Sequence, residues 1–339
     1  MSTKKTEESK QTESGKPVKR RDFLKIGLQA AGALSLTSVG AYFLLKKPNY
    51  DHPEKNPYET GIDSIGRIPK EKYCKVTSSS IEIPFETAKA LAVDKDNNIY
   101  VSGDKNILIL SKEGKTITQF ATDITATALA IGDDKTIYAA FESHIATYSA
   151  TGKLVKEWPA FEKKSYITSL ALNGDTIYAA DAEEEMVHKY KTDGKLIQSI
   201  GSKDKSKVDS FVLPSYFFDV AIAPDNTLWV ANTGKHKLIN FNADGNLRSA
   251  WGEASAAVED FCGCCNPSHF AIMKDGSFIT AEKGIVRVKK YDPNGKFIGA
   301  IAGPEHFRES STGLEIAINS NSDILVLEPA VRKIHIFNI

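Results

Sequence analysis

Three of the four cysteines in this 339-residue chain lie within four positions, at Cys262, Cys264 and Cys265, and His269 follows them closely. Thiolate and imidazole are ligands that copper, zinc and iron–sulfur clusters accept. The sequence therefore predicts a metal site built from these four residues, with copper, zinc or an iron–sulfur cluster as the bound group. Two alternatives stay open. One is a disulfide, either Cys262 with Cys265 or a vicinal Cys264–Cys265 bond, and the other is a set of cysteines that only fills a buried corner.

A second group of residues, Asp219, His269 and Glu315, occupies the same position in three successive sequence repeats, where an apolar segment begins. Equivalent positions of neighbouring repeats come together when the repeats pack side by side. A histidine between two carboxylates suits proton transfer, so these three are the catalytic candidates. The structural alternative is that they cap the starts of strands.

The elements that position both groups are six copies of one repeat, which begins at Ala90. Each copy holds an apolar strand, a polar turn and a second apolar strand, as in Ala90–Val93 followed by Ile99–Val101. The second strands start 38, 40, 51, 50 and 46 residues apart, and a third strand, a glycine turn and a fourth strand follow. Four strands in about 40 to 50 residues are typical of a propeller blade. The sequence thus predicts an all-β fold, a six-bladed β-propeller.

The sixth copy is incomplete, because the chain ends at Ile339 after three of its strands. We expect residues 73–84, which precede the repeats, to supply the missing outer strand and close the ring without an open edge. Cys74 is then expected on the outer strand of the last blade. Polar residues that end the second strands of the last four copies are expected to hold neighbouring loops; they are Asp181, Asn232, Glu282 and Glu328.

The aliphatic strand, the Asp–Gly-type turn and a strand such as Ile99-Tyr100-Val101 resemble an NHL repeat, and the resemblance covers residues 73–339. It implies a binding platform, and some relatives act as lyases or lactonases. Such lactonases hold a divalent metal through Asn and Asp just before the inner strand. No carboxylate is found at that place in this sequence, which argues against lactonase chemistry; the residues are Lys89, Thr127, Thr168, Phe218, Ser268 and Leu314.

The N-terminal residues carry a targeting signal rather than a fold. The segment Lys19–Lys25 resembles a twin-arginine export signal, whose recognised residues here are Arg20, Arg21, Phe23 and Leu24. An uncharged stretch follows, and at about 20 residues such a stretch is long enough to cross a bilayer. The predicted organisation is a signal and membrane anchor in residues 1–47, with the membrane crossed by 26–45, a linker in 48–72 and the propeller in 73–339. Cleavage at the small residues Val39-Gly40-Ala41 is the alternative to retention as an anchor.

This organisation predicts both the location and the partners of the protein. The signal implies the twin-arginine export machinery as one partner, and it implies the periplasm or the outer face of the cytoplasmic membrane as the location. An envelope protein is expected as a further partner. Nucleic acid is not expected, because the formal net charge is zero and the excess of positive charge lies in the N-terminal tail.

The preferred function is therefore an exported, membrane-tethered binding or redox- or metal-associated module, with the cysteine loop at the mouth of the propeller channel. Catalysis is the less favoured alternative, since no phosphate loop, nucleophile elbow or His-Glu-x-x-His motif is present in the sequence. In that alternative the protein is a propeller enzyme of the lyase or hydrolase type, and Asp219, His269 and Glu315 act at the channel mouth with a bound metal.

Overall fold

The computed structural model describes residues 67–159, 164–309 and 311–339. The predicted twin-arginine signal and the anchor helix over 26–45 lie outside these residues. Within the described ranges, no helix is long and apolar enough to span a membrane.

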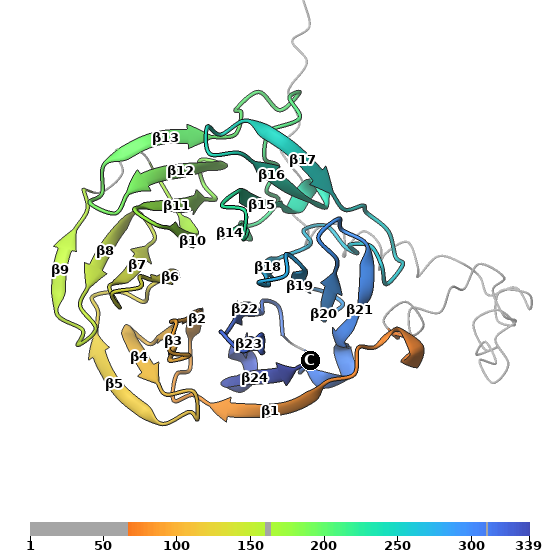
Figure 1. The fold of residues 1–339 in the computed structure, drawn as a ribbon, viewed down its shortest axis with the longest axis horizontal. Helices are drawn as coiled ribbons and strands as arrows, with labels where there is room; N and C mark the ends of the chain where they lie inside the picture. Colours follow the sequence, from red (N-terminus) through yellow and green to blue (C-terminus); the bar gives the residue numbers. More distant parts are fainter. Residues whose placement is uncertain (1–66, 160–163, 310) are drawn as a thin grey trace, which may run out of the picture. The chain divides into compact units, whose positions relative to one another are not determined.

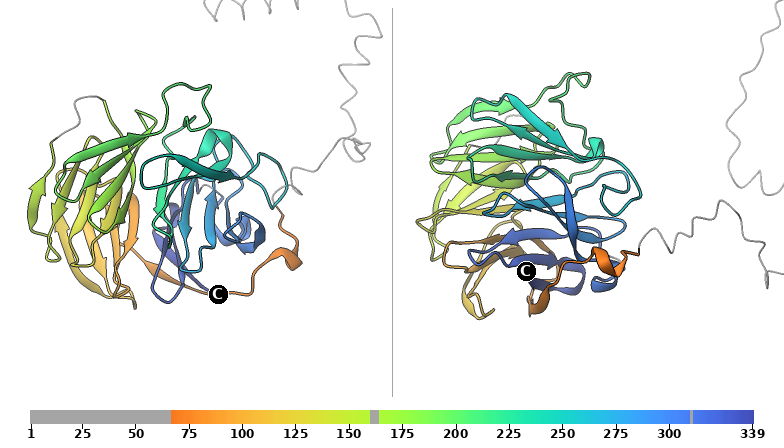
Figure 2. Two further views of the ribbon diagram at one scale, coloured as in Figure 1. Left: turned by 45° about the horizontal axis from the view of Figure 1, so that its top comes forward. Right: turned by 45° about the vertical axis from the view of Figure 1, so that its right-hand side comes forward.

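Six four-stranded antiparallel sheets stand around a common axis, which confirms the all-β six-bladed propeller (Figure 1). The tilted views in Figure 2 show neighbouring sheets packed face to face as blades. In blades one to five the chain runs from the innermost strand outward. The strands of the first three blades are β2 (Ala88–Val93), β3 (Ile99–Gly103), β4 (Asn106–Leu110) and β5 (Thr116–Ala121); β6 (Ala128–Ile131), β7 (Ile137–Phe141), β8 (His144–Tyr148) and β9 (Leu154–Glu157); and β10 (Ile167–Asn173), β11 (Thr176–Asp181), β12 (Met186–Lys191) and β13 (Leu196–Ile200).

The last three blades follow the same plan, and four short 3-10 helices connect elements of the chain. The strands are β14 (Val220–Ile222), β15 (Leu228–Asn232), β16 (Lys237–Phe241) and β17 (Leu247–Trp251); β18 (His269–Ile272), β19 (Phe278–Glu282), β20 (Arg287–Tyr291) and β21 (Phe297–Ala302); and β22 (Glu315–Ile318), β23 (Ile324–Glu328), β24 (Lys333–Asn338) and β1 (Thr77–Glu82). The 3-10 helices are η1 (Lys70–Lys72), η2 (Thr233–Lys235), η3 (Pro304–His306) and η4 (Pro329–Val331).

The ring is closed by β1, as the sequence predicts, because this early strand pairs antiparallel with the last strand, β24. The pairing runs from Thr77 opposite Asn338 to Glu82 opposite Lys333. The expectation that Cys74 lies on this outer strand is wrong. The strand begins only at Thr77, and the Cys74 amide instead donates to the carbonyl of Ala300 in β21, the outer strand of the preceding blade.

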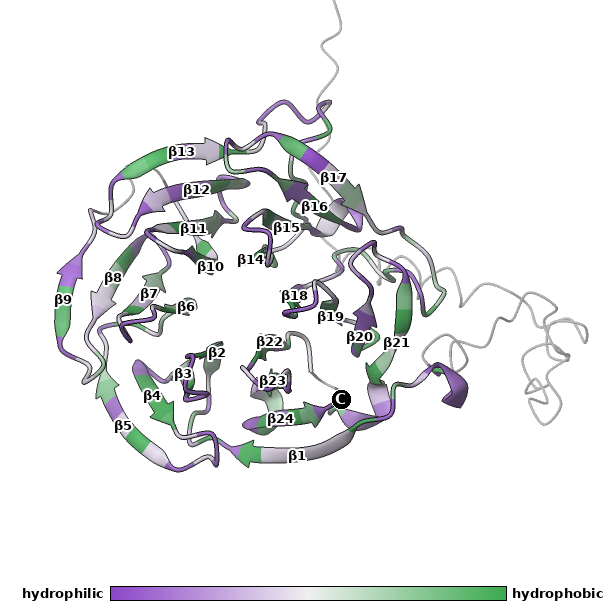
Figure 3. Cartoon of the chain, in the orientation of Figure 1, coloured by the Kyte–Doolittle hydropathy of each residue, from purple (hydrophilic) through white to green (hydrophobic). Residues whose placement is uncertain are grey.

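The core lies between the blades rather than inside one of them. Every residue of the second strand β15 is buried, whereas all four residues of the outer strand β9 are exposed. A strand that packs on both faces needs apolar side chains on both faces, so the second strands are mostly apolar and four of them end in a polar residue. Figure 3 shows apolar and polar colours mixed along the outer strands β5, β9, β13 and β17.

The ends of the second strands hold the loops that precede their blades, as predicted. Asp181, Asn232, Glu282 and Glu328 each accept a backbone N–H from the preceding loop, the donors being Tyr166, Val212, Cys262 and Arg308 in that order. All four acceptor side chains are buried. A buried carboxylate or amide needs such partners, so these residues are committed to the fold.

Removal of residues 73–84 is expected to destabilise the propeller, because β24 loses its outer partner and blade six gains an open edge. We expect a loss of several kcal/mol, seen as a drop of about 10 °C or more in Tm or as aggregation. Thermal melts of this deletion and of a control deletion of residues 1–60 provide the test. Equal melting of the two truncated proteins would contradict the role given to β1.

Candidate functional site

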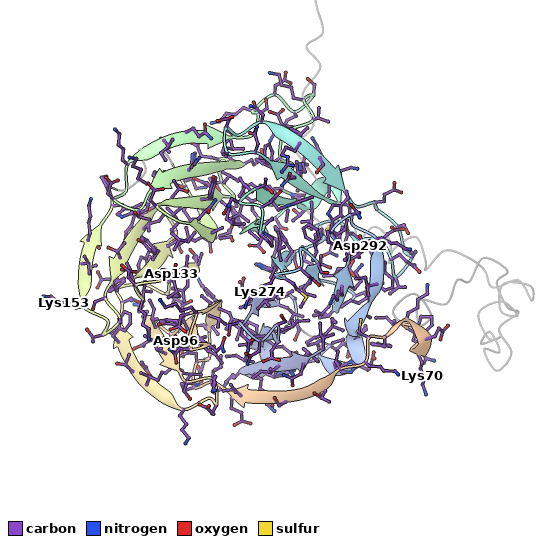
Figure 4. The ribbon with its side chains drawn as sticks, in the orientation of Figure 1. Lys70, Asp96, Asp133, Lys153, Lys274 and Asp292 are labelled. Atoms are coloured by element: carbon purple, nitrogen blue, oxygen red, sulfur yellow. The ribbon has the colours of Figure 1, made fainter. Side chains whose placement is uncertain are left out.

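The candidate site is a pocket of about 510 Å³ at the face of the ring where the innermost strands begin. Figure 4 shows side chains filling the spaces between the blades around the axis. The pocket wall mixes charged, hydroxyl and aromatic groups; it includes Glu86, Lys89, Thr127, Tyr166, Thr168, Tyr216, Phe217, His269, Ser311, Thr312 and Glu315. Polar groups around an apolar wall are typical of small-molecule sites.

The structure brings Asp219, His269 and Glu315 into contact at this pocket. His269 is the first residue of β18, and its Nε2 lies 3.1 Å from Oε1 of Glu315 at the start of β22. Its Nδ1 lies 3.6 Å from Oδ2 of Asp219, which immediately precedes β14. The three blades therefore deliver one side chain each, because the residues occupy equivalent positions at the strand starts. Their chemical role stays a prediction.

Asp219 is bound mainly by the fold. Its Oδ1 accepts from the Ser169 hydroxyl at 2.5 Å and from the Val220 amide at 2.9 Å. Its Oδ2 accepts from the Phe270 amide at 2.8 Å. The carboxylate thus links blades three, four and five and orients His269, so the capping alternative describes Asp219 well.

The pKa values of His269 and Glu315 both differ from those of the free side chains. Burial lowers the pKa of His269, but the charges of Glu315 and Asp219 outweigh burial and raise that pKa to about 9. Burial raises the pKa of Glu315 to about 7, with His269 opposing and Asp219 adding to the rise. The Glu315 side chain is 23% exposed, against 9% for His269, so Glu315 is the member of the pair that solvent reaches.

The pocket continues into an axial channel of about 350 Å³ that all six innermost strands line. Glu315 and Thr168 line both the pocket and the channel, so they lie where the two spaces meet. Asp219 lines the channel and His269 lines the pocket. A molecule that fills the pocket therefore lies against the Glu315 side chain where the pocket meets the channel.

The cysteine loop lies directly before β18 and is held by buried charge. The Cys262 amide donates to Oε1 of Glu282 at 3.0 Å, and Glu282 is paired with Arg287 and Lys289. Lys289 also donates to the carbonyl oxygens of Val258 at 3.1 Å and Asp260 at 2.6 Å. Together these contacts hold the stretch from Val258 to Cys262, on the N-terminal side of Cys264 and Cys265.

The sulfurs of Cys264 and Cys265 lie 3.2 Å apart, and all four cysteines of the chain are free thiols. Cys264 is exposed and Cys265 is buried. Burial raises the pKa of Cys265, but Ser215, Cys264 and Lys283 together lower it below its usual value. Among the described residues, no group of three or more His, Cys, Asp and Glu is placed to hold a metal ion. The metal set of Cys262, Cys264, Cys265 and His269 thus stays a prediction that this geometry does not support.

Lys283 and Phe217 connect the cysteine loop with the pocket through a chain of contacts. The Lys283 ammonium lies against Cys265 and 4.8 Å from the centre of the Phe217 ring. Phe217 meets the His269 ring edge-on, with 5.8 Å between ring centroids, and it lines the pocket. Sequence reasoning missed Phe217 and Lys283. The signal for Phe217 was the aromatic run Tyr216-Phe217-Phe218 at the end of a long loop, whereas nothing in the pattern of the sequence marks Lys283.

Solved structures with the same fold include enzymes. A streptogramin B lyase is 12% identical, with 79% of this chain and 99% of that chain covered and a TM-score of 0.55. A catalytically inactive histidine-to-alanine variant of virginiamycin B lyase from Staphylococcus aureus, with quinupristin, is 11% identical over 78% of this chain and 100% of that one, with a TM-score of 0.54. A gluconolactonase from Xanthomonas campestris is 15% identical over 78% of this chain and 90% of that one, with a TM-score of 0.58.

These similarities show the fold, a six-bladed propeller shared with lyases and a gluconolactonase. No protein-family model matches the sequence, and a search of curated proteins returns no significant match. The NHL-repeat assignment and the twin-arginine signal therefore stay predictions.

The charge cluster that holds the cysteine loop gives a pH-dependent prediction. Burial, with the Arg287 charge adding to it and Glu282 opposing it, lowers the pKa of Lys289 to about 8. The folded chain then binds fewer protons than the unfolded chain between about pH 8 and 10.5, so this lysine adds stability as pH rises through that window. Lys289→Met removes that gain.

The measurement is urea unfolding of the wild type and of K289M at about pH 7.5 and 9.5. The wild type should gain on the order of 1–2 kcal/mol relative to K289M between these two pH values. Lys290→Met, at the neighbouring and partly exposed position, is the matched control and should follow the wild type. Parallel pH profiles for the wild type and K289M would show that Lys289 titrates normally in the folded protein.

Proposed function

We propose that the pocket of about 510 Å³ is an active site of the lyase or hydrolase type, in which Glu315, positioned by His269, transfers a proton to or from a small polar substrate. The observation that carries this proposal is the contact of a partly exposed carboxyl group with a buried imidazole at the wall of a 510 Å³ pocket. The sequence alone favoured a binding role. The assembled pair and the enzymes among the structures of the same fold now favour catalysis.

Each residue of the site has a separate task. Glu315 faces the cavity and is the group that touches substrate. His269 is the positioning partner, since both of its ring nitrogens face carboxylates, and Asp219 holds the ring in place. A pKa of Glu315 raised to about 7 supports the assignment, because a proton-transfer group works best when its pKa is near the operating pH. We derive no step through a metal, because both nitrogens of His269 are already paired.

The aromatic wall favours a substrate with a ring. The Tyr166 and Tyr216 rings lie 4.8 Å apart between centroids, and both line the pocket beside Phe217. Such faces stack on a flat or cyclic group, while the Lys89 ammonium offers hydrogen-bond donors. The Thr127 and Thr168 hydroxyls donate to backbone carbonyls, so toward a substrate they can only accept. A cyclic ester or a cyclic peptide-like compound fits this combination, and the proton removed or delivered by Glu315 then lies beside the bond that breaks.

The test is turnover of a panel of lactones and cyclic depsipeptides by the wild type and by Glu315→Gln. We expect E315Q to lower kcat/KM by about 10²- to 10⁴-fold, mainly through kcat, because it keeps the shape of the side chain and removes its proton transfer. His269→Gln should lower kcat and flatten the pH profile. Glu113→Gln, an exposed acid of the β4–β5 turn, is the matched control. Full activity of E315Q, or a wild type inactive on the whole panel, would count against the enzyme assignment.

The location is a second part of the proposal. We infer that the protein is exported by the twin-arginine machinery and remains tethered at the outer face of the cytoplasmic membrane through residues 26–45. The support is the order of a basic tail, an arginine pair, an apolar stretch and a lysine pair in the sequence.

Export should stop when the guanidinium groups are replaced and the charge is kept. Arg20→Lys together with Arg21→Lys is expected to leave folded protein in the cytoplasm, because an ammonium group does not reproduce bidentate guanidinium contacts. Cell fractionation with immunodetection measures the outcome, and Lys4→Arg with Lys5→Arg is the charge-matched control. An unchanged amount in the envelope fraction would remove the export proposal.

One observation favours a second candidate function, the redox- or metal-associated role predicted from the sequence. The thiols of Cys264 and Cys265 face each other at 3.2 Å, and a chain of contacts through Lys283 and Phe217 connects Cys265 with His269. This role is compatible with an envelope location, where thiols meet an oxidising environment.

A further inference from the structure

We propose that Cys264 and Cys265 form a reversible vicinal disulfide and exchange electrons with the disulfide of another molecule. This inference rests on the second candidate function and names its reaction and its class of reactant. Two adjacent free thiols with sulfurs 3.2 Å apart carry it, together with the different exposure of the two side chains.

The sulfur separation argues for sulfur–sulfur chemistry over a shared metal ion. Two thiolates on one tetrahedral zinc ion, with bonds of about 2.3 Å, lie about 3.8 Å apart. The pair at 3.2 Å is already closer than that, so a shared ion has to push the two side chains apart. Among the described residues, no cluster of three or more His, Cys, Asp and Glu supplies the remaining ligands. Bond formation brings two sulfurs that already face each other closer together, toward about 2.0 Å, and closes a ring through the intervening peptide.

The difference in exposure gives each sulfur one role. Cys264 is exposed, so an incoming disulfide reaches its sulfur first. Cys265 is buried at 1% exposure and cannot meet a bulky reactant, but it touches Cys264. This is the arrangement of an attacking thiol with a resolving thiol beside it.

The reaction balances without any other oxidant. The hydrogen bond with Cys265 raises the pKa of Cys264, so this thiol first has to lose its proton to solvent. The Cys264 thiolate then attacks one sulfur of a disulfide RSSR, forms a Cys264–SR mixed disulfide and releases one thiolate. The Cys265 thiolate then attacks the Cys264 sulfur, forms the Cys264–Cys265 bond and releases the second thiolate. The two cysteines lose two electrons and two protons, and RSSR becomes two RSH.

The surroundings of the buried sulfur suit the second step. Ser215 and the Lys283 ammonium lie against Cys265, and Lys283 also lies 3.5 Å from the Ser215 hydroxyl. A nearby cation and a hydroxyl donor stabilise a thiolate. Asn266 adds rigidity, because its amide oxygen accepts from the Lys283 amide at 2.9 Å and its amide nitrogen donates to the Lys283 carbonyl at 3.0 Å. The loop and the lysine are thus held in one frame.

The experiment equilibrates the full-length protein in buffers with rising ratios of oxidised to reduced glutathione, followed by thiol counting and peptide mass mapping. We expect the loss of two of the four thiols in one transition, a mass lower by two hydrogens, a mapped Cys264–Cys265 bond and full recovery with dithiothreitol. Cys265→Ser should instead stop at a stable glutathione adduct on Cys264. Cys264→Ser should lower the rate of reaction with glutathione disulfide at least ten-fold. Cys74→Ser and Cys262→Ser are the matched controls and should keep the transition.

In a second experiment the reduced protein is mixed with insulin, whose disulfides represent a protein reactant, and reduction of insulin is measured. Reaction with glutathione alone identifies a small-molecule disulfide as the reactant, and reduction of insulin as well extends the reactant to protein disulfides. Four free thiols at every glutathione ratio overturn the inference, and so does a mapped Cys262–Cys265 bond. Metal analysis of the reduced protein distinguishes failure of this inference from failure of the second candidate function. Bound metal without disulfide exchange overturns this inference and keeps a metal-associated role. If the protein shows neither bound metal nor disulfide exchange, the second candidate function is ruled out as well.

Discussion

The pairing of β1 with β24 is the constraint on which the rest of the propeller depends. Each blade is too small to bury its own apolar faces, so every blade needs a neighbour on both sides. The strand that precedes the first repeat completes blade six, and blades one and six thereby become neighbours. The same closure sets the six innermost strands around one axis, which places the starts of β14, β18 and β22 at a single mouth.

A second device allows the ring to carry loops of different length. In four blades a polar side chain at the end of the second strand accepts a hydrogen bond from an amide of the preceding loop. In blade five this acceptor is part of a buried charge cluster. Glu282 there is fully buried, and two buried cations, Arg287 and Lys289, surround it. Burial of an unpaired carboxylate is unfavourable, so the two cations offset the desolvation of Glu282. Lys289 also holds the inserted segment through the carbonyl oxygens of that segment. The cysteine loop is therefore an insertion that the repeat already had a way to fix.

The sequence allowed the prediction of whatever follows from periodicity. The repeat identified six blades, the missing strand, and the shared position of Asp219, His269 and Glu315, because equivalent residues of adjacent blades lie side by side. It did not reveal contacts made by irregular loops. Phe217 and Lys283 meet the site through loop conformations that no repeat encodes, and Cys74 was misplaced because the closing strand starts at Thr77, a boundary that periodicity does not set.

The proposed chemistry centres on Glu315 because the other two residues of the site, Asp219 and His269, are occupied by contacts within the fold. Asp219 bonds to Ser169, Val220 and Phe270, so both of its oxygens are occupied by the fold. His269 is enclosed, with a carboxylate facing each nitrogen and Phe217 against its ring. Of these three residues, only Glu315 lines both the pocket and the channel. In the proposed function, Asp219 and His269 therefore act through Glu315 by fixing its geometry and shifting its pKa, and a ligand in the pocket meets their combined charge at that one carboxyl group.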